Sequence, residues 1–139
     1  MNVLKLIGLL IVLSLVVSVV DACFTIEEKI YYSDKSNFIN VSGTVTHIKY
    51  SERDGCLYLA FSDLSPKMDD TNFKLIEENA KIAQENGLDD VLDYGIKVDF
   101  ITAPRYFGDG YVMPIVSLNI DGVCYLEFEE GYDNFIKKW

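Results

Sequence analysis

The sequence predicts an α+β fold that is mainly β: a small coiled antiparallel sheet of about five strands with one interrupting helix, preceded by an N-terminal hydrophobic helix. Three observations support this class. A long apolar stretch opens the 139-residue chain. Several runs of β-branched or alternating residues, bounded by turn residues, follow it and are typical of strands. One segment near the middle instead places its apolar residues at helical spacing.

The apolar stretch predicts a membrane-targeting segment. Between residues 6 and 20 only one glycine and two serines interrupt it. A secretory signal has an apolar run of about 7–15 residues and a spanning helix has about 20, so residues 1–22 fit either a signal peptide or a transmembrane anchor. Lys5 precedes the stretch and acidic residues follow it, and positive charge stays cytoplasmic. We therefore expect a membrane-anchored chain whose folded domain lies on the extracytoplasmic side.

The stretch ends in Val20, Asp21, Ala22 and Cys23. This ending resembles a bacterial lipobox, in which a small residue precedes a cysteine that becomes lipidated, although Asp21 departs from that pattern. The resemblance makes Cys23 a candidate lipidation site and the chain a candidate lipoprotein. The alternative is an unmodified cysteine at the outer end of an uncleaved helix. Residues 23–37 are polar and mixed, and we interpret them as a tether.

Two further cysteines, Cys56 and Cys124, belong to the outer domain. Outside the cytoplasm such a pair persists as a disulfide. A bridge here closes a long loop and is expected to stabilise the fold by about 4 kcal/mol on the chain-entropy account. The alternative is two buried free thiols. We favour the disulfide, and the cysteine and histidine spacing predicts no zinc site.

The formal net charge of −10 falls on the outer domain. An acidic surface repels phosphate backbones, so no nucleic-acid partner is expected. It also disfavours docking on anionic lipid. Acidity of this kind mainly keeps a domain soluble.

Residues 38–139 are expected to form a single domain. Residues 38–50 are rich in β-branched residues, and residues 56–61 alternate, so the two runs predict a hairpin across the polar turn between them. Gly43 in the first run predicts a bulge. A helix is then expected from a cap at Asp70 or Thr71 to a stop at residues 86–87. Its apolar stripe comprises Phe73, Ile76, Ala80 and Ala83.

A second β region follows the helix. Residues 96–100 alternate and predict a strand, and residues 111–120 are expected to form the next one. The Asp121-Gly122 pair predicts a tight hairpin into residues 123–128. The chain ends with apolar residues at i, i+3, i+4 and i+7, which is the pattern of an amphipathic helix. These residues are Tyr132, Phe135, Ile136 and Trp139.

Five strands, a glycine-kinked first strand and one helix resemble an OB-like barrel among the closed forms. An OB fold places its helix after the third strand, whereas two strands precede the helix here. Either residues 30–32 supply the missing strand, or the fold is a different α+β sheet.

The loop at residues 104–111 is the candidate binding site. It combines three aromatic residues, one arginine and two glycines between two strands, and binding residues concentrate on loops that a rigid scaffold holds. Arginine and tyrosine are also favoured anchors at interfaces. The alternative is that the aromatic residues fold back over an open end of the barrel. The expected binding residues are Arg105, Tyr106, Phe107, Asp109 and Tyr111.

The leading functional hypothesis is a membrane-anchored extracytoplasmic domain that binds a protein or an envelope component and is not expected to be an enzyme. His47 lacks a recognisable nucleophile motif, and no cofactor or metal motif stands out. One alternative is a hydrolase of envelope polymers that uses paired carboxylates. Another is a calcium-stabilised module. The acidic residues behind both alternatives are Asp63, Asp69, Asp70, Asp89, Asp90, Asp93, Glu127, Glu129, Glu130 and Asp133.

Overall fold

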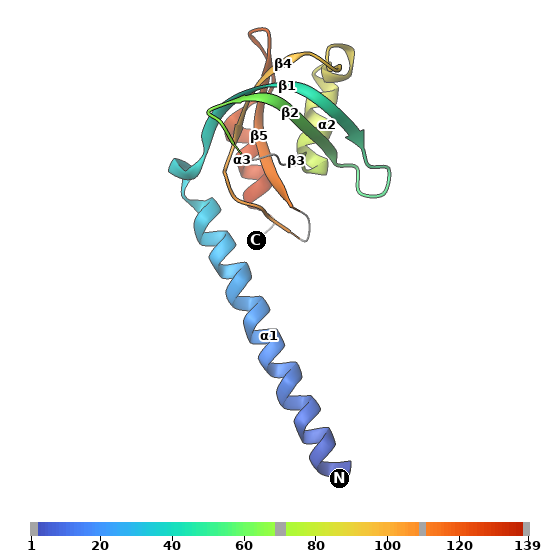
Figure 1. Cartoon of the computed structure of the whole chain (residues 1–139), viewed down its shortest axis with the longest axis vertical. Coiled ribbons are helices and arrows are strands. Elements are labelled where there is room, and N and C mark those ends of the chain that lie inside the picture. Colours follow the sequence, from blue (N-terminus) through green and yellow to red (C-terminus); the bar gives the residue numbers. More distant parts are fainter. Residues whose placement is uncertain (1–2, 69–71, 109–110, 138–139) are drawn as a thin grey trace.

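The structure is a computed structural model that describes residues 3–68, 72–108 and 111–137, without the side chains of residues 15–25. Two groups of three strands are separated by helix α2 and flanked by helices α1 and α3. In order, the elements are α1 (Val3–Ser33), η1 (Lys35–Asn37), β1 (Ile39–Tyr50), β2 (Leu57–Ser65), β3 (Asn72–Leu75), α2 (Glu77–Glu85), η2 (Leu88–Asp90), β4 (Lys97–Thr102), β5 (Val112–Ile120), β6 (Val123–Leu126) and α3 (Phe128–Ile136). Figure 1 shows α1 leading away from the sheet, against which α2 and α3 pack.

The sheet closes into a five-stranded barrel with one extra strand. Its order is β3-β2-β1-β4-β5-β6, and a further pairing of β3 with β5 joins the first strand to the fifth. The β3–β5 pairing is parallel and the other pairings are antiparallel. Closure removes the exposed edges that an open sheet of this size would present. The structure therefore confirms the predicted small barrel within a mixed α/β protein.

The third strand of the barrel, β3, lies where the sequence predicts the first turn of the helix. Phe73 is buried and pairs with Leu59 of β2, while the neighbouring Asn72 is exposed. The helix α2 begins only at Glu77, with Ile76 at its N-cap. The predicted helix start was therefore wrong, and the predicted caps Asp70 and Thr71 lie outside the described residues. The alternative strand at residues 30–32 was also wrong, because these residues belong to α1.

The predicted bulge in β1 is confirmed. The register of β1 against β2 shifts between Ser42 and Thr44, around Gly43. A Cβ atom at Gly43 would lie 2.8 Å from side-chain carbons of both Leu64 and Phe61. Glycine is therefore needed where β1 bends closely over β2.

Two hydrophobic clusters hold the fold together. The larger cluster fills the barrel, where Phe61 and Phe100 stack at 4.6 Å and Phe73 meets Phe100 edge-on at 4.9 Å. The second cluster lies outside the barrel wall and joins the end of α1, the β4–β5 loop and α3. Its buried members are Tyr32, Ile76, Ala103, Phe107, Val112, Val116 and Phe135.

The C-terminal helix is confirmed as α3. Tyr132 and Phe135 are buried, as the amphipathic stripe predicts, and Trp139 lies outside the described residues. At Gly131 a Cβ atom would lie 1.9 Å from the carbonyl oxygen of Val116 in β5. The helix therefore packs directly on the strand backbone at this glycine.

The predicted disulfide between Cys56 and Cys124 is not formed. Both are free thiols, and Cys56 is buried at the start of β2 whereas Cys124 is exposed on β6. Cys124 pairs in the ladder with Asn119 of β5, whereas Cys56 lies between the β1–β2 turn and β2. The expectation was wrong because it rested on compartment and cysteine count, and neither of these fixes where two cysteines lie in the fold.

The region predicted as a tether is ordered into α1 and the short turn η1. Tyr32, in the last turn of α1, has no exposed surface. The lipidation candidate Cys23 lies outside the described side chains. Within the described part of the chain, no helix is long and apolar enough to cross a membrane.

Candidate binding site at the β4–β5 loop

The loop between β4 and β5 holds the predicted binding residues. Figure 1 shows it at the end of the barrel from which α1 leads away. The structure describes Arg105, Tyr106, Phe107 and Tyr111, whereas Asp109 lies outside the described residues. The described residues divide into a fixed base and an exposed tip.

Backbone hydrogen bonds fix the base of the loop. The Tyr32 hydroxyl donates to the carbonyl oxygen of Arg105 at 2.7 Å, which ties the loop to α1. The amide of Phe107 donates to the carbonyl oxygen of Val112 at 3.1 Å, and the amide of Arg105 donates to that of Ala103 at 2.7 Å. The backbone of the loop is therefore held before any ligand arrives.

Phe107 is a structural residue of this loop. Its side chain is buried and meets Phe135 edge-on at 5.0 Å and Tyr32 at 6.5 Å. For this one aromatic residue, the structure agrees with the alternative that the loop folds back on the protein. The buried ring of Phe107 therefore anchors the loop on α1 and α3.

Tyr106 and Tyr111 form the exposed tip. Their rings meet edge-on with centroids 5.7 Å apart. Tyr106 is 40% exposed and Tyr111 is 82% exposed. Two neighbouring tyrosines on a supported loop offer large contact area at low conformational cost.

Arg105 faces the end of α1. Its guanidinium carbon lies 5.0 Å from the ring centroid of Tyr31 and the residue is half-buried. Burial raises the pKa of the Tyr31 hydroxyl, and the positive charge of Arg105 opposes part of this shift. The guanidinium is therefore positioned over the Tyr31 ring by a cation–π contact.

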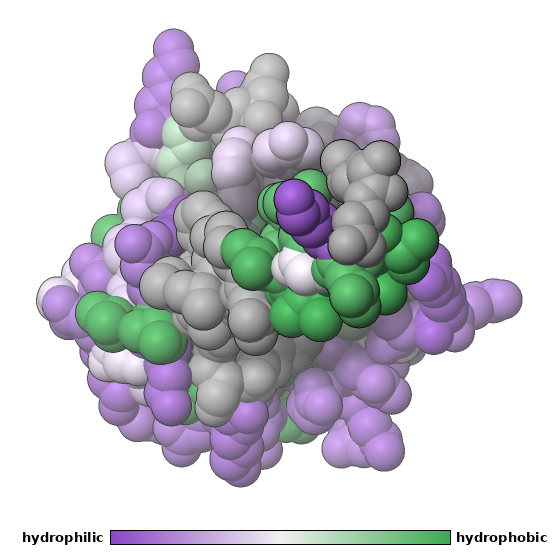
Figure 2. Space-filling view, turned by 90° about the horizontal axis from the view of Figure 1, so that it is seen from below, coloured by the Kyte–Doolittle hydropathy of each residue, from purple (hydrophilic) through white to green (hydrophobic). Residues whose placement is uncertain are grey.

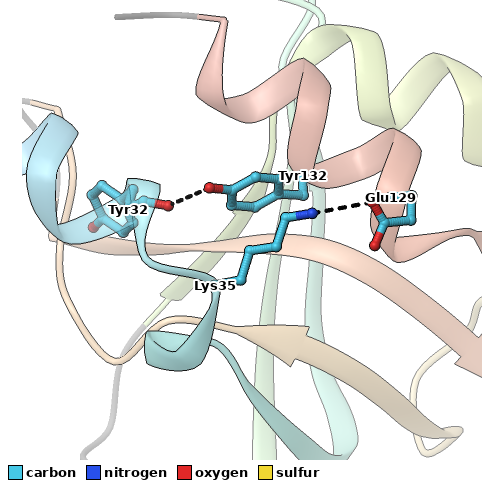
Figure 3. Close-up of polar contacts among 4 residues, drawn as sticks. All are labelled: Tyr32, Lys35, Glu129 and Tyr132. Atoms are coloured by element: carbon cyan, nitrogen blue, oxygen red, sulfur yellow. Dashed lines mark hydrogen bonds and ion pairs between the residues drawn. The ribbon is translucent and has the colours of Figure 1, made fainter.

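A second layer of contacts fixes α1 on α3, as Figure 3 shows. The Tyr132 hydroxyl donates to the carbonyl oxygen of Tyr32 at 2.9 Å. Lys35 forms an ion pair with Glu129 at 3.2 Å and lies 5.0 Å from the Tyr132 ring centroid. Burial is the largest cause that raises the pKa of the Tyr32 hydroxyl, which therefore stays protonated. The support of the loop thus extends through α1 to α3.

Lys74 extends this surface onto the strands, and the sequence did not single it out. Its Nζ lies 5.7 Å from the ring centroid of Phe107 and 5.4 Å from that of Tyr58. Beyond Tyr58, a shallow hollow crosses the outer faces of β1 and β2 and includes His47 and Lys49. The apolar–polar alternation of residues 72–75 could have revealed Lys74, but the run lay inside a segment interpreted as helix.

The described acidic residues do not gather into a metal site. No group of three or more acidic, histidine or cysteine side chains able to hold a metal occurs among the residues that the structure covers. Every one of the following is exposed: Asp63, Asp89, Asp90, Asp93, Glu127, Glu129, Glu130 and Asp133. Asp69 and Asp70 lie outside the described residues.

Comparison with known proteins assigns no family to the chain. No protein-family model matches it, and no curated protein is significantly similar to it in sequence.

Proposed function

We propose that this chain is a membrane-anchored, extracytoplasmic binding domain that captures a protein or an envelope component through the tyrosine pair of its β4–β5 loop. The observation that carries the proposal is the exposure of Tyr106 and Tyr111 at the tip of a loop whose base is fixed. A loop already held in its bound conformation loses less entropy on binding, so its affinity is higher. Tyrosine is also among the residues most enriched in binding hot spots.

The barrel is proposed to be of the OB type. The strand order, the parallel closure of β3 on β5 and the position of α2 between β3 and β4 support this assignment. In OB folds the β1–β2 and β4–β5 loops flank the ligand face. This arrangement favours the tyrosine loop as part of a recognition surface.

Attachment to the membrane is proposed through residues 3–20. The described apolar side chains between Val3 and Leu13 are exposed, and Figure 2 shows apolar surface at this end of the molecule. Apolar surface of this extent in water marks an interaction site. Lys5 is the basic residue before the apolar run, which supports a cytoplasmic start and an outer barrel.

Capture by the full chain tests the proposed function. The tagged protein in detergent is incubated with an envelope extract of its host, and retained species are identified by mass spectrometry and by their sensitivity to protease or periodate. The double variant Tyr106→Ser, Tyr111→Ser is expected to retain at least tenfold less of the species that the unchanged protein captures. Its melting temperature is expected to stay within about 2 °C, because exposed side chains contribute little to stability.

Tyr94 supplies the matched control. It is 63% exposed and lies before β4, away from the tyrosine loop. The variant Tyr94→Ser is expected to capture as the unchanged protein does. Equal capture by the double variant and the unchanged protein would contradict the proposed function.

A further inference from the structure

A small pocket of about 260 Å³ lies on the outer wall of the barrel, where β1, β4 and β5 run side by side. Two cross-strand rows of side chains line it. Ladder pairing defines these rows as Asn40, Ile101 and Ser117, and as Ser42, Asp99 and Asn119. The intervening residues on the same strands face the barrel interior, because side chains alternate along a strand.

Among the described residues, the pocket contains one carboxylate, that of Asp99, and one buried oxygen without a partner, that of Asn119. Asp99 accepts a hydrogen bond from the Ser42 hydroxyl, and within the described part of the chain it forms no ion pair. The Oδ1 atom of Asn119 is buried and has no hydrogen-bond partner among the described residues. No lysine, arginine or histidine lines the pocket.

We propose that this pocket binds a primary ammonium group, carried either by a small free amine or by a lysine side chain of a partner. An ammonium group has three donors and no acceptor. Its single charge matches the one carboxylate of Asp99, and its N–H groups supply the donor that Asn119 Oδ1 lacks. Hydrogen bonds to charged groups are about twice as strong as neutral ones, which favours this ligand over an uncharged hydroxyl.

The inference does not depend on the proposed function. The pocket uses the outer faces of β1, β4 and β5, whereas the proposed capture surface is the loop tip of Tyr106 and Tyr111. A variant of one surface leaves the other intact. Failure of either proposal is therefore recognised separately.

Titration of the ¹⁵N-labelled full chain with methylammonium chloride tests the proposal, at neutral pH in a non-ionic polyoxyethylene detergent. Saturable shifts are expected at the amides of residues 40–42, 99 and 117–119. Tetramethylammonium has the same charge but no N–H donor, and it is expected to bind at least tenfold more weakly. A parallel titration with Nα-acetyl-lysine amide separates the sources, since tighter binding than methylammonium indicates a lysine side chain and weaker binding a free amine.

Two variants and one control complete the test. Asp99→Asn keeps an acceptor for Ser42 but removes the charge, and it is expected to weaken methylammonium binding more than tenfold. Asp133→Asn removes an exposed charge from α3 and is expected to change nothing. Asn119→Leu is expected to raise the melting temperature, since it removes an unpaired buried oxygen, and to weaken binding about tenfold. Linear shifts, equal response to tetramethylammonium, or unchanged binding by Asp99→Asn would overturn the proposal and leave a pocket that holds only water.

Discussion

Tyr32 is the side chain on which the support of the tyrosine loop depends. It is fully buried, and its hydroxyl and carbonyl groups bond to residues 73 and 100 positions away in the sequence. No local pattern indicates this role, because Tyr32 gains these hydrogen-bond partners only in the tertiary fold. The sequence therefore predicted a tether here.

Removing the Tyr32 hydroxyl is expected to destabilise the protein. Tyr32→Phe leaves the Arg105 carbonyl oxygen without its donor, at a cost of about 1–2 kcal/mol in the free energy of unfolding. Urea denaturation of the full chain in detergent measures this cost. Tyr31→Phe is the control, because its hydroxyl forms no hydrogen bond with the residues that the structure describes, and it is expected to cost under about 0.5 kcal/mol. Equal effects of the two substitutions would contradict the role assigned to Tyr32.

Acid is expected to loosen the β1–β2 turn at Asp54. The backbone amide of Cys56 and the side chain of Ser51 are the main causes that lower the pKa of this carboxyl from 3.8 to about 2. Because the pKa is lower in the folded state, the stabilisation is present above about pH 4 and is lost as the pH falls through about 2.

The amide chemical shift of Cys56 followed between pH 5 and pH 1.5 measures this transition. In Asp54→Ala the transition is expected to be absent. A midpoint near pH 4 in the unchanged protein would show that the hydrogen bonds to Asp54 are not formed.

At the scale of elements, the sequence predicted most strands and the hairpins but divided the middle of the chain wrongly. The Asp121-Gly122 turn could be predicted because both residues tolerate the positive φ angles found there, 51° and 80°. The strand β3 could not, because it has four residues and Phe73 and Ile76 also fit a helical spacing. This segment is a strand rather than a helix because it pairs with β2 and β5 at the same time. Such pairing is a tertiary contact that local sequence does not reveal.

The contact of α3 with β5 is expected to tolerate no side chain at Gly131. In Gly131→Ala the new Cβ would meet the Val116 carbonyl oxygen, which is backbone and cannot rotate away. The helix must move off the strand, at a cost of about 3 kcal/mol in the free energy of unfolding. Asp133→Ala in the same helix is exposed and is expected to change stability by less than about 0.5 kcal/mol. Denaturant unfolding of both variants measures the difference, and a neutral Gly131→Ala would contradict the close packing.

At the scale of the whole molecule, one continuous support links α1, α3 and the loop. The hydrogen bonds of Tyr32 join the end of α1 to the β4–β5 loop and to α3. The ion pair of Lys35 joins the turn η1, which connects α1 to β1, to α3 as well. The sequence could predict that an apolar segment precedes a small barrel, because local residue patterns indicate both the apolar segment and the strands. It could not predict that the end of α1 at Tyr32 docks on α3 and on the β4–β5 loop, since docking depends on contacts between residues far apart in the chain.

Site-specific photo-cross-linking in host cells tests the central claim most directly. A benzoylphenylalanine replaces Tyr106 in one variant and the exposed Tyr94 in another, and both are irradiated under the same conditions. The proposed capture surface predicts a discrete cross-linked species from position 106 and none from position 94. Cross-linking from position 94 alone, or the same species from both positions, would contradict the claim that the tyrosine loop is where this protein binds.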